Sequence, residues 1–141
     1  MNGKTASGKG FNYDIVIRES HVDSIGHMNN ATYLALFEEA RWEWLTHEGY
    51  GFREIQKSMQ GPVILDIHIK FLNEIRLREK ILIVSEMMDY DGKIAHLKQQ
   101  MLKNDGRVAA EAVFTFGLFD MKLRKIIEPT EAWKKALGIS K

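Results

Sequence analysis

Residues 30–48 read NATYLALFEEARWEWLTHE, and this segment decides the fold. Its apolar side chains recur at the spacing of a helix: Tyr33, Leu36, Phe37, Ala40 and Trp44. The pattern predicts one long helix, capped at its start by Asn29 or Asn30 and ended at Gly49 in the left-handed conformation. Because apolar side chains extend well around the cylinder, we expect other elements to enclose most of this helix.

The rest of the chain is dominated by patterns typical of β-strands. Strands are expected over residues 11–18, 63–71, 79–89, 94–103 and 107–120. In the second of them, one face is predicted to carry the apolar side chains Val63, Leu65, Ile67, Ile69 and Phe71. Asp91-Gly92 and Asn104-Asp105-Gly106 predict hairpin turns. A short helical turn or a loop is expected over 51–59, and a short terminal helix over 130–137.

An antiparallel sheet needs a cover for its apolar face, and only the helix over residues 30–48 is long enough to provide one. We therefore predict an α+β fold, in which a five-stranded antiparallel sheet curls around one long central helix. Residues 1–10 are expected to form a flexible tail, and residues 11–141 a single domain. Because one sheet face and two edges stay uncovered, we expect a homodimer or homotetramer.

Composition excludes several classes of protein. The 141 residues carry a net charge of +1 and no cysteine, so disulfides and thiolate chemistry are excluded and a cytoplasmic location is the default expectation. Acidic and basic residues are interspersed, which argues against a nucleic-acid partner. No stretch approaches the roughly 20 apolar residues of a membrane helix, so no membrane insertion is expected.

The residues just before the helix are those that hydrolysis requires. Asp23, His27, Asn29 and Asn30 lie in a polar segment that leads into the predicted helix start. The first turn of a helix has N–H groups without intrahelical partners, and these can stabilise an oxyanion. A carboxylate beside them can activate water. An acid next to oxyanion donors is the minimum requirement for hydrolysing an ester or thioester.

Four features around this helix start form a signature: Asp23, the run Gly-His-Met-Asn-Asn at 26–30, Tyr33, and the run Phe-Glu-Glu-Ala-Arg at 37–41. The signature resembles that of the hotdog-fold acyl thioesterases, the 4-hydroxybenzoyl-CoA thioesterase-like group, and the resemblance extends over about residues 11–129. It implies a hotdog fold, an acyl-CoA substrate, no cofactor and active sites at a dimer interface.

The resemblance also implies roles for individual residues. Asp23 matches the catalytic acid of the family, and its role as general base or as nucleophile stays open. Backbone N–H groups around Asn30 and Ala31 would bind the thioester carbonyl. We therefore take Asp23, His27 and Asn30 as candidate catalytic residues, and Asn29, Ala31 and Tyr33 as candidate substrate-binding residues.

The sequence departs from the motif of one related group, and it contains a second candidate for the catalytic carboxylate. Plant acyl-carrier-protein thioesterases carry asparagine and histidine where this chain has Ile25 and His27. Glu39 is a second candidate catalytic carboxylate, and Glu38 is spaced to form an ion pair with Arg41.

The leading function is hydrolysis of a fatty or aromatic acyl-CoA. The alternatives are an acyl-thioester-binding protein without activity, an acyl-carrier-protein thioesterase, or a hotdog hydratase. A metal site at His21, Asp23 and His27 is the less favoured interpretation, since no helical pair of metal-ligating histidines accompanies them.

Overall fold

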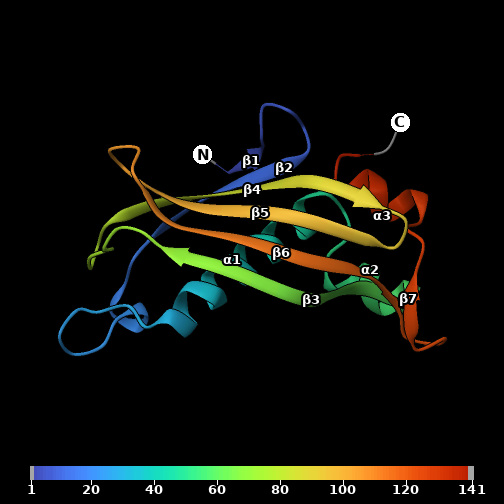
Figure 1. The fold of residues 1–141 in the computed structure, drawn as a ribbon, viewed down its shortest axis with the longest axis horizontal. Coiled ribbons are helices and arrows are strands. Elements are labelled where there is room, and N and C mark those ends of the chain that lie inside the picture. Colours follow the sequence, from blue (N-terminus) through green and yellow to red (C-terminus); the bar gives the residue numbers. More distant parts are fainter. Residues whose placement is uncertain (1, 140–141) are drawn as a thin grey trace.

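The computed structural model describes residues 2–139 and contains one seven-stranded antiparallel sheet (Figure 1). The strands follow one another across the sheet in the order β1 (Gly3–Lys4), β2 (Gly10–Val16), β4 (Lys80–Asp91), β5 (Ile94–Lys103), β6 (Val108–Asp120) and β3 (Gln60–Phe71), and β7 (Lys125–Ile127) also pairs with β6. The helices are η1 (Glu19–His21, a 3₁₀-helix), α1 (Asn30–His47), α2 (Phe52–Ser58) and α3 (Glu131–Ala136).

The predicted α+β class with an antiparallel sheet is confirmed, but the prediction of five strands is wrong. The five expected strands are β2 to β6, and β1 and β7 add two short ones. Gly3 and Lys4 pair with Asn12 and Phe11 of β2, inside the segment expected to be a flexible tail. Strands of two or three residues are too short to show an alternating pattern of apolar and polar side chains. They form because neighbouring strands supply their hydrogen-bond partners.

Helix α1 begins and ends where its local signals indicate. The Asn29 side-chain oxygen accepts a hydrogen bond from the Ala31 N–H at 2.8 Å and so caps the helix. At the other end Gly49 has a φ of 81°. The Tyr50 N–H donates to the Leu45 carbonyl at 2.8 Å and the Gly49 N–H to the Thr46 carbonyl at 3.2 Å, which is the Schellman pattern.

The apolar side of α1 packs against one face of the sheet, behind the strands in Figure 1. Its buried side chains are Tyr33, Leu36, Phe37, Ala40, Trp44 and Leu45. The ring of Phe37 meets that of Phe114 on β6 edge-on, with centroids 6.0 Å apart. Emptying such a buried aromatic site costs about 3–5 kcal/mol, so this contact helps hold α1 at a fixed place on the sheet.

Strand β3 lies at one edge of the sheet, and β6 is its only partner among the described strands. A β-bulge between Ile64 and Asp66 shifts its register. In that register the side chains opposite the buried face of β6 are Pro62, Ile64, Ile67, Ile69 and Phe71. The predicted common face for Val63 and Leu65 is therefore wrong, because the bulge interrupts the alternation. The β3 apolar row, as we call these five side chains, faces the α1 side and stays partly exposed.

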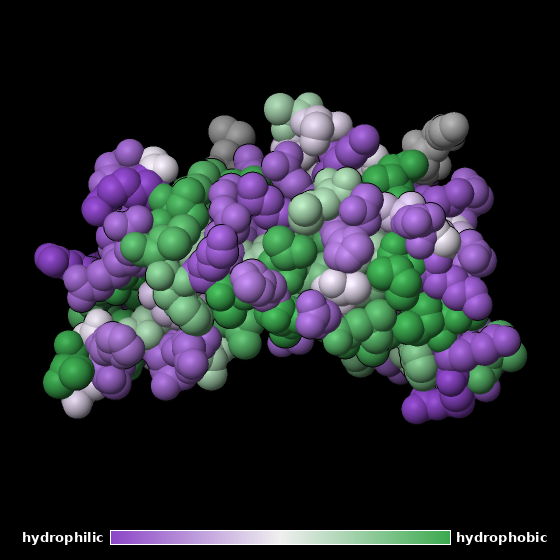
Figure 2. All heavy atoms as spheres, viewed as in Figure 1, coloured by the Kyte–Doolittle hydropathy of each residue, from purple (hydrophilic) through white to green (hydrophobic). Residues whose placement is uncertain are grey.

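The opposite face of the sheet is turned toward the viewer in Figure 2, where hydrophilic side chains are mixed with apolar ones. Half-buried His96, Lys98 and Gln100 alternate along β5 with buried core residues, in agreement with a sheet that has one apolar side. No helix among the described residues is long and apolar enough to cross a membrane.

Candidate active site

A tight loop before α1 holds the carboxylate of Asp23. Its Oδ1 accepts hydrogen bonds from the N–H groups of Ile25 at 3.1 Å and His27 at 2.9 Å. The loop is closed further by the Asp23 N–H, which donates to the His27 carbonyl at 3.0 Å. The Oδ2 atom accepts no hydrogen bond from the described residues, and Asp23 is exposed. One carboxylate oxygen is thus anchored by the loop, while the other is open to water.

The start of α1 follows this loop directly. The Ala31 N–H, one of the two expected oxyanion donors, is occupied by the Asn29 side chain. The Asn29 carbonyl accepts from the Thr32 N–H at 2.9 Å. The Asn30 N–H has no acceptor among residues 2–139. Of the two expected amides, that of Asn30 is the one available to a substrate.

A cavity of about 240 Å³ lies beside the helix start and is lined by His27, Met28, Tyr33, Phe71, Leu72, Asn73, Glu74 and Ile75. Tyr33 is buried, and its ring meets Phe71 of β3 edge-on with centroids 5.0 Å apart. Burial, followed by the charges of Glu74 and Glu79, raises the pKa of Tyr33, so its hydroxyl stays protonated as a donor. The fold thus brings together His27 and Tyr33, two of the predicted site residues.

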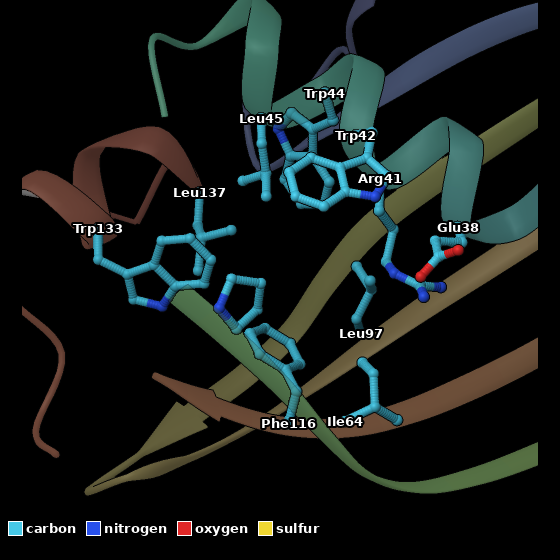
Figure 3. A pocket seen from close by; sticks show the side chains of 11 residues that line it. Glu38, Arg41, Trp42, Trp44, Leu45, Ile64, Leu97, Phe116, Trp133 and Leu137 are labelled. Carbon is cyan, nitrogen blue, oxygen red and sulfur yellow. The ribbon is translucent and has the colours of Figure 1, made fainter. Parts of the chain in front are cut away.

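A second cavity, of about 130 Å³, lies further along α1 (Figure 3). Helix α1 supplies Glu38, Arg41, Trp42, Trp44 and Leu45, the strands supply Pro62, Ile64, Leu97 and Phe116, and the C-terminal segment supplies Trp133 and Leu137. This cavity is not predictable from the sequence patterns, because its walls come from segments far apart in the chain.

Arg41 lines this second cavity with a partly buried side chain. Its Nη1 donates to Gln99 Oε1 at 2.9 Å, and its Cζ lies 4.4 Å from the centroid of the Phe114 ring. The predicted ion pair between Glu38 and Arg41 is wrong, since no carboxylate oxygen of the described residues lies within 4.0 Å of the guanidinium nitrogens. Arg41 donates to the sheet residue Gln99, and the exposed Glu38 lies beside Arg41 in Figure 3 without forming an ion pair with it.

Two further candidates from the sequence are placed elsewhere. Glu39 accepts a hydrogen bond from the Tyr13 hydroxyl, on the side of α1 that faces β2. The ring nitrogen Nδ1 of His21 accepts from the Arg18 N–H at 2.9 Å. Within residues 2–139 no group of three or more His, Cys, Asp or Glu side chains is arranged to hold a metal ion.

The β3 apolar row has one end at each of the two cavities. Phe71, at one end of the row, lines the cavity beside the helix start, whereas Ile64 and Pro62 line the cavity at Arg41. On the opposite wall α1 advances from Tyr33 to Arg41, about 12 Å at 1.5 Å per residue. The candidate site therefore comprises an anchored carboxylate, a free helix N–H and a row of apolar side chains that ends at the second cavity.

Comparison with known proteins identifies the family of the chain. The model of the thioesterase-like superfamily matches residues 17–137. The chain is 32% identical over 114 residues to the long-chain acyl-CoA thioesterase FadM of Escherichia coli, covering 80% of this chain and 86% of FadM. The crystal structure of the probable thioesterase YbaW from Escherichia coli is 28% identical, with a TM-score of 0.79 over 92% of this chain and 98% of that one.

A further relative is the L-carnitine dehydrogenase/betainyl-CoA thioesterase of Agrobacterium fabrum, 24% identical over 141 residues. The match covers 96% of this chain but only 28% of that longer protein. With most of its length matched by the family model, the chain belongs to the thioesterase-like superfamily, in the family of hotdog acyl-CoA thioesterases that its sequence resembles.

Proposed function

We propose that this chain hydrolyses the thioester of a fatty acyl-CoA, with Asp23 as general base or nucleophile and the start of α1 as oxyanion site. The observation that carries the proposal is the anchored Asp23 carboxylate, whose free Oδ2 lies in the loop that leads into the unoccupied Asn30 N–H. A carboxylate is ionised at neutral pH and either takes a proton from water or attacks the carbonyl itself.

In this mechanism the thioester carbonyl accepts a hydrogen bond from the Asn30 N–H, at the positive end of the α1 dipole. Negative charge develops on that oxygen when the carbonyl is attacked, so the donor stabilises the transition state more than the substrate. Ala31 contributes a second donor only if Asn29 releases its N–H, because the two are hydrogen-bonded at 2.8 Å.

The remaining candidates have supporting roles. His27 is held by its backbone in the Asp23 loop and lines the first cavity, where its ring contacts the substrate near the thioester. Tyr33 forms the wall of the same cavity. The acyl group extends from there along the β3 apolar row toward the second cavity. An elongated path of this kind suits a linear acyl chain better than a compact aromatic one.

We further propose that the active form is a homodimer assembled through β3. This edge strand leaves its outer backbone groups without a strand partner, and Leu65, Ile67 and Phe71 on it are exposed. Pairing with a second copy of β3 covers these side chains. It also places the partner beside the two cavities that α1 and β3 line, in keeping with the active sites at a dimer interface that the family resemblance implies.

The proposal is tested by following CoA thiol release from acyl-CoAs of increasing chain length, with the native protein and an Asp23→Asn variant. Asparagine keeps an oxygen for the Ile25 and His27 N–H groups, so the loop is retained while the base is lost. We expect kcat to fall by about 10²–10⁴-fold. Equal rates in the two proteins contradict the role of Asp23.

The same substrates distinguish the other functions. Acyl groups on a carrier protein, compared with the same groups on CoA, identify the preferred carrier. Loss of enoyl-CoA absorbance without thiol release identifies a hydratase. Stoichiometric binding without turnover of any thioester identifies a binding protein and contradicts hydrolysis.

A further inference from the structure

We propose that the cavity at Arg41 binds an oxygen atom carried near the far end of the acyl group, so that ω-carboxy- and ω-hydroxyacyl thioesters are preferred over unsubstituted ones. The proposal rests on the proposed function and names the substrate class of that site. Its ligand chemistry is an oxygen acceptor, supplied either by a carboxylate or by a hydroxyl group.

The first support is the surroundings of the guanidinium group. Arg41 carries five N–H donors, but its one hydrogen bond to the described residues goes to Gln99 Oε1. Its other close partner is the face of the Phe114 ring. No carboxylate of the described residues lies within 4.0 Å of this partly buried cation, and an oxygen ligand in the cavity would supply an acceptor for its remaining donors.

A buried polar network holds Gln99 in the orientation that this interaction requires. Gln99 Nε2 donates to the Phe37 carbonyl at 3.0 Å and to Ser85 Oγ at 2.8 Å. Because both donors of the amide are directed away, its Oε1 is left facing Arg41. Gln99 and Ser85 are fully buried, so the guanidinium is held from the side of the sheet, while Arg41 also lines the cavity.

The charges around the cavity favour an anion or a neutral oxygen over a cation. Burial lowers the pKa of Arg41 to about 10, and the charge of Glu38 opposes that shift, so the guanidinium is still protonated at neutral pH. Glu38 is exposed at the same cavity, where water screens its charge, whereas Arg41 is partly buried and its charge is screened less. A quaternary ammonium group, such as that of a betainyl thioester, would therefore be disfavoured here.

The position of the cavity fits the far end of an acyl chain. Arg41 follows Asn30 by eleven residues on α1, about 16 Å along the helix axis. The β3 apolar row spans the interval, and Ile64 of that row lines the cavity itself. An acyl group with its carbonyl at Asn30 and an apolar chain along the row brings its last atoms to Arg41.

The first experiment compares kcat/KM for four CoA thioesters of equal chain length, ending in methyl, hydroxyl, carboxylate or trimethylammonium. For the native protein we expect the carboxylate to exceed the methyl end by about tenfold or more, as for a charged hydrogen bond, with the trimethylammonium end lowest. Arg41→Met keeps the stem over Phe114 and removes the donors, and it should abolish the carboxylate preference. Glu38→Gln removes the opposite charge from the same cavity and should preserve that preference.

Binding supplies a readout that does not depend on hydrolysis. The three tryptophans of the chain, Trp42, Trp44 and Trp133, all line this cavity, so their fluorescence reports its occupation. Titration with a free dicarboxylate, an ω-hydroxy acid and a monocarboxylate of equal length should show tighter binding of the first two. If no thioester is hydrolysed, the proposed function fails, and this titration still tests Arg41.

Several results would overturn the inference. A native protein that prefers the methyl end, or shows no preference in kinetics and fluorescence, has no oxygen site at Arg41. A preference that persists in Arg41→Met places the determinant elsewhere. If Arg41→Met does not fold, Ile64→Trp fills the cavity from the β3 side instead, and the carboxylate preference must then disappear. Its persistence in that variant contradicts the proposal.

Discussion

The Tyr13 hydroxyl donates a hydrogen bond to Glu39 Oε2 at 2.6 Å, which joins β2 to a part of α1 outside the second cavity. Burial, followed by this hydrogen bond, raises the pKa of Tyr13, so the donor persists through neutral and mildly alkaline pH. The carboxylate is therefore engaged in a structural contact, away from the Asn30 N–H.

Glu39→Gln should consequently hydrolyse acyl-CoA at a rate within about twofold of the native protein, the range of ordinary surface substitutions. The introduced glutamine keeps an acceptor for the Tyr13 hydroxyl, so stability should also change little. Steady-state thiol release measured beside Asp23→Asn provides the comparison. A loss in Glu39→Gln as large as that in Asp23→Asn would transfer the catalytic role to Glu39.

Asp120 should make a pH-dependent contribution to stability. Its Oδ1 accepts from the N–H groups of Leu123 at 2.8 Å and Lys122 at 2.9 Å, and its Oδ2 accepts from Gln60 Nε2 at 3.1 Å. The Leu123 backbone bond, followed by Gln60, lowers the pKa of Asp120 below its ordinary value of 3.8. A lowered folded-state pKa means stabilisation that is present above 3.8 and lost as the pH falls through the folded-state value.

Asp120→Asn should therefore lower the Tm at neutral pH, and the difference from the native protein should shrink in acid below 3.8. Thermal unfolding at a series of pH values measures it. Asp66→Asn, at an exposed carboxylate without a side-chain hydrogen bond among the described residues, serves as the control. A Tm difference that stays constant into acid contradicts the prediction.

Leu65 should be important for the proposed assembly. It lies on edge strand β3 and is 48% exposed in the isolated chain. A lysine at the centre of a β3–β3 contact would bury a charge next to its symmetry mate, so Leu65→Lys should convert dimers to monomers. Leu123→Lys serves as the control, because it introduces the same charge at a side chain that is 61% exposed in the turn before β7.

Light scattering after size exclusion gives the mass of each variant, and thiol release gives its activity. We expect the Leu65 variant to lose both dimer and activity, and the Leu123 variant to keep both. A native protein that is monomeric and active contradicts assembly through β3 as a requirement for hydrolysis.

Sequence patterns located the elements whose signals are local. The Asn29 cap and the left-handed Gly49 follow from residues within one turn of each helix end. The turn at Gly92, with a φ of 61°, likewise follows from the Asp-Gly dipeptide that precedes β5. These three predictions are confirmed. In each case the neighbouring residues alone determine the backbone conformation.

The features that escaped prediction depend on distant partners. The bulge between Ile64 and Asp66 arises where β3 pairs with β6, about fifty residues later in the chain. The alternating pattern of β3 itself does not predict it. The helical spacing predicts an ion pair between Arg41 and Glu38. In the folded chain Arg41 instead donates to Gln99 and lies over the ring of Phe114. Of the candidate site, the sequence predicted the loop and helix start, and not the second cavity.

The Asn30 N–H can be removed with little change to the helix, which makes the oxyanion role directly testable. Asn30 is the first residue of α1, where proline is favoured because its missing N–H has no intrahelical partner. Asn29, with φ of −67° and ψ of 148°, already has the extended conformation that a following proline requires. Asn30→Pro should therefore keep its Tm while kcat falls by about 10²–10³-fold. Asn30→Ala, which keeps the N–H and removes the side chain, should remain active, and full activity in Asn30→Pro would remove this amide from the mechanism.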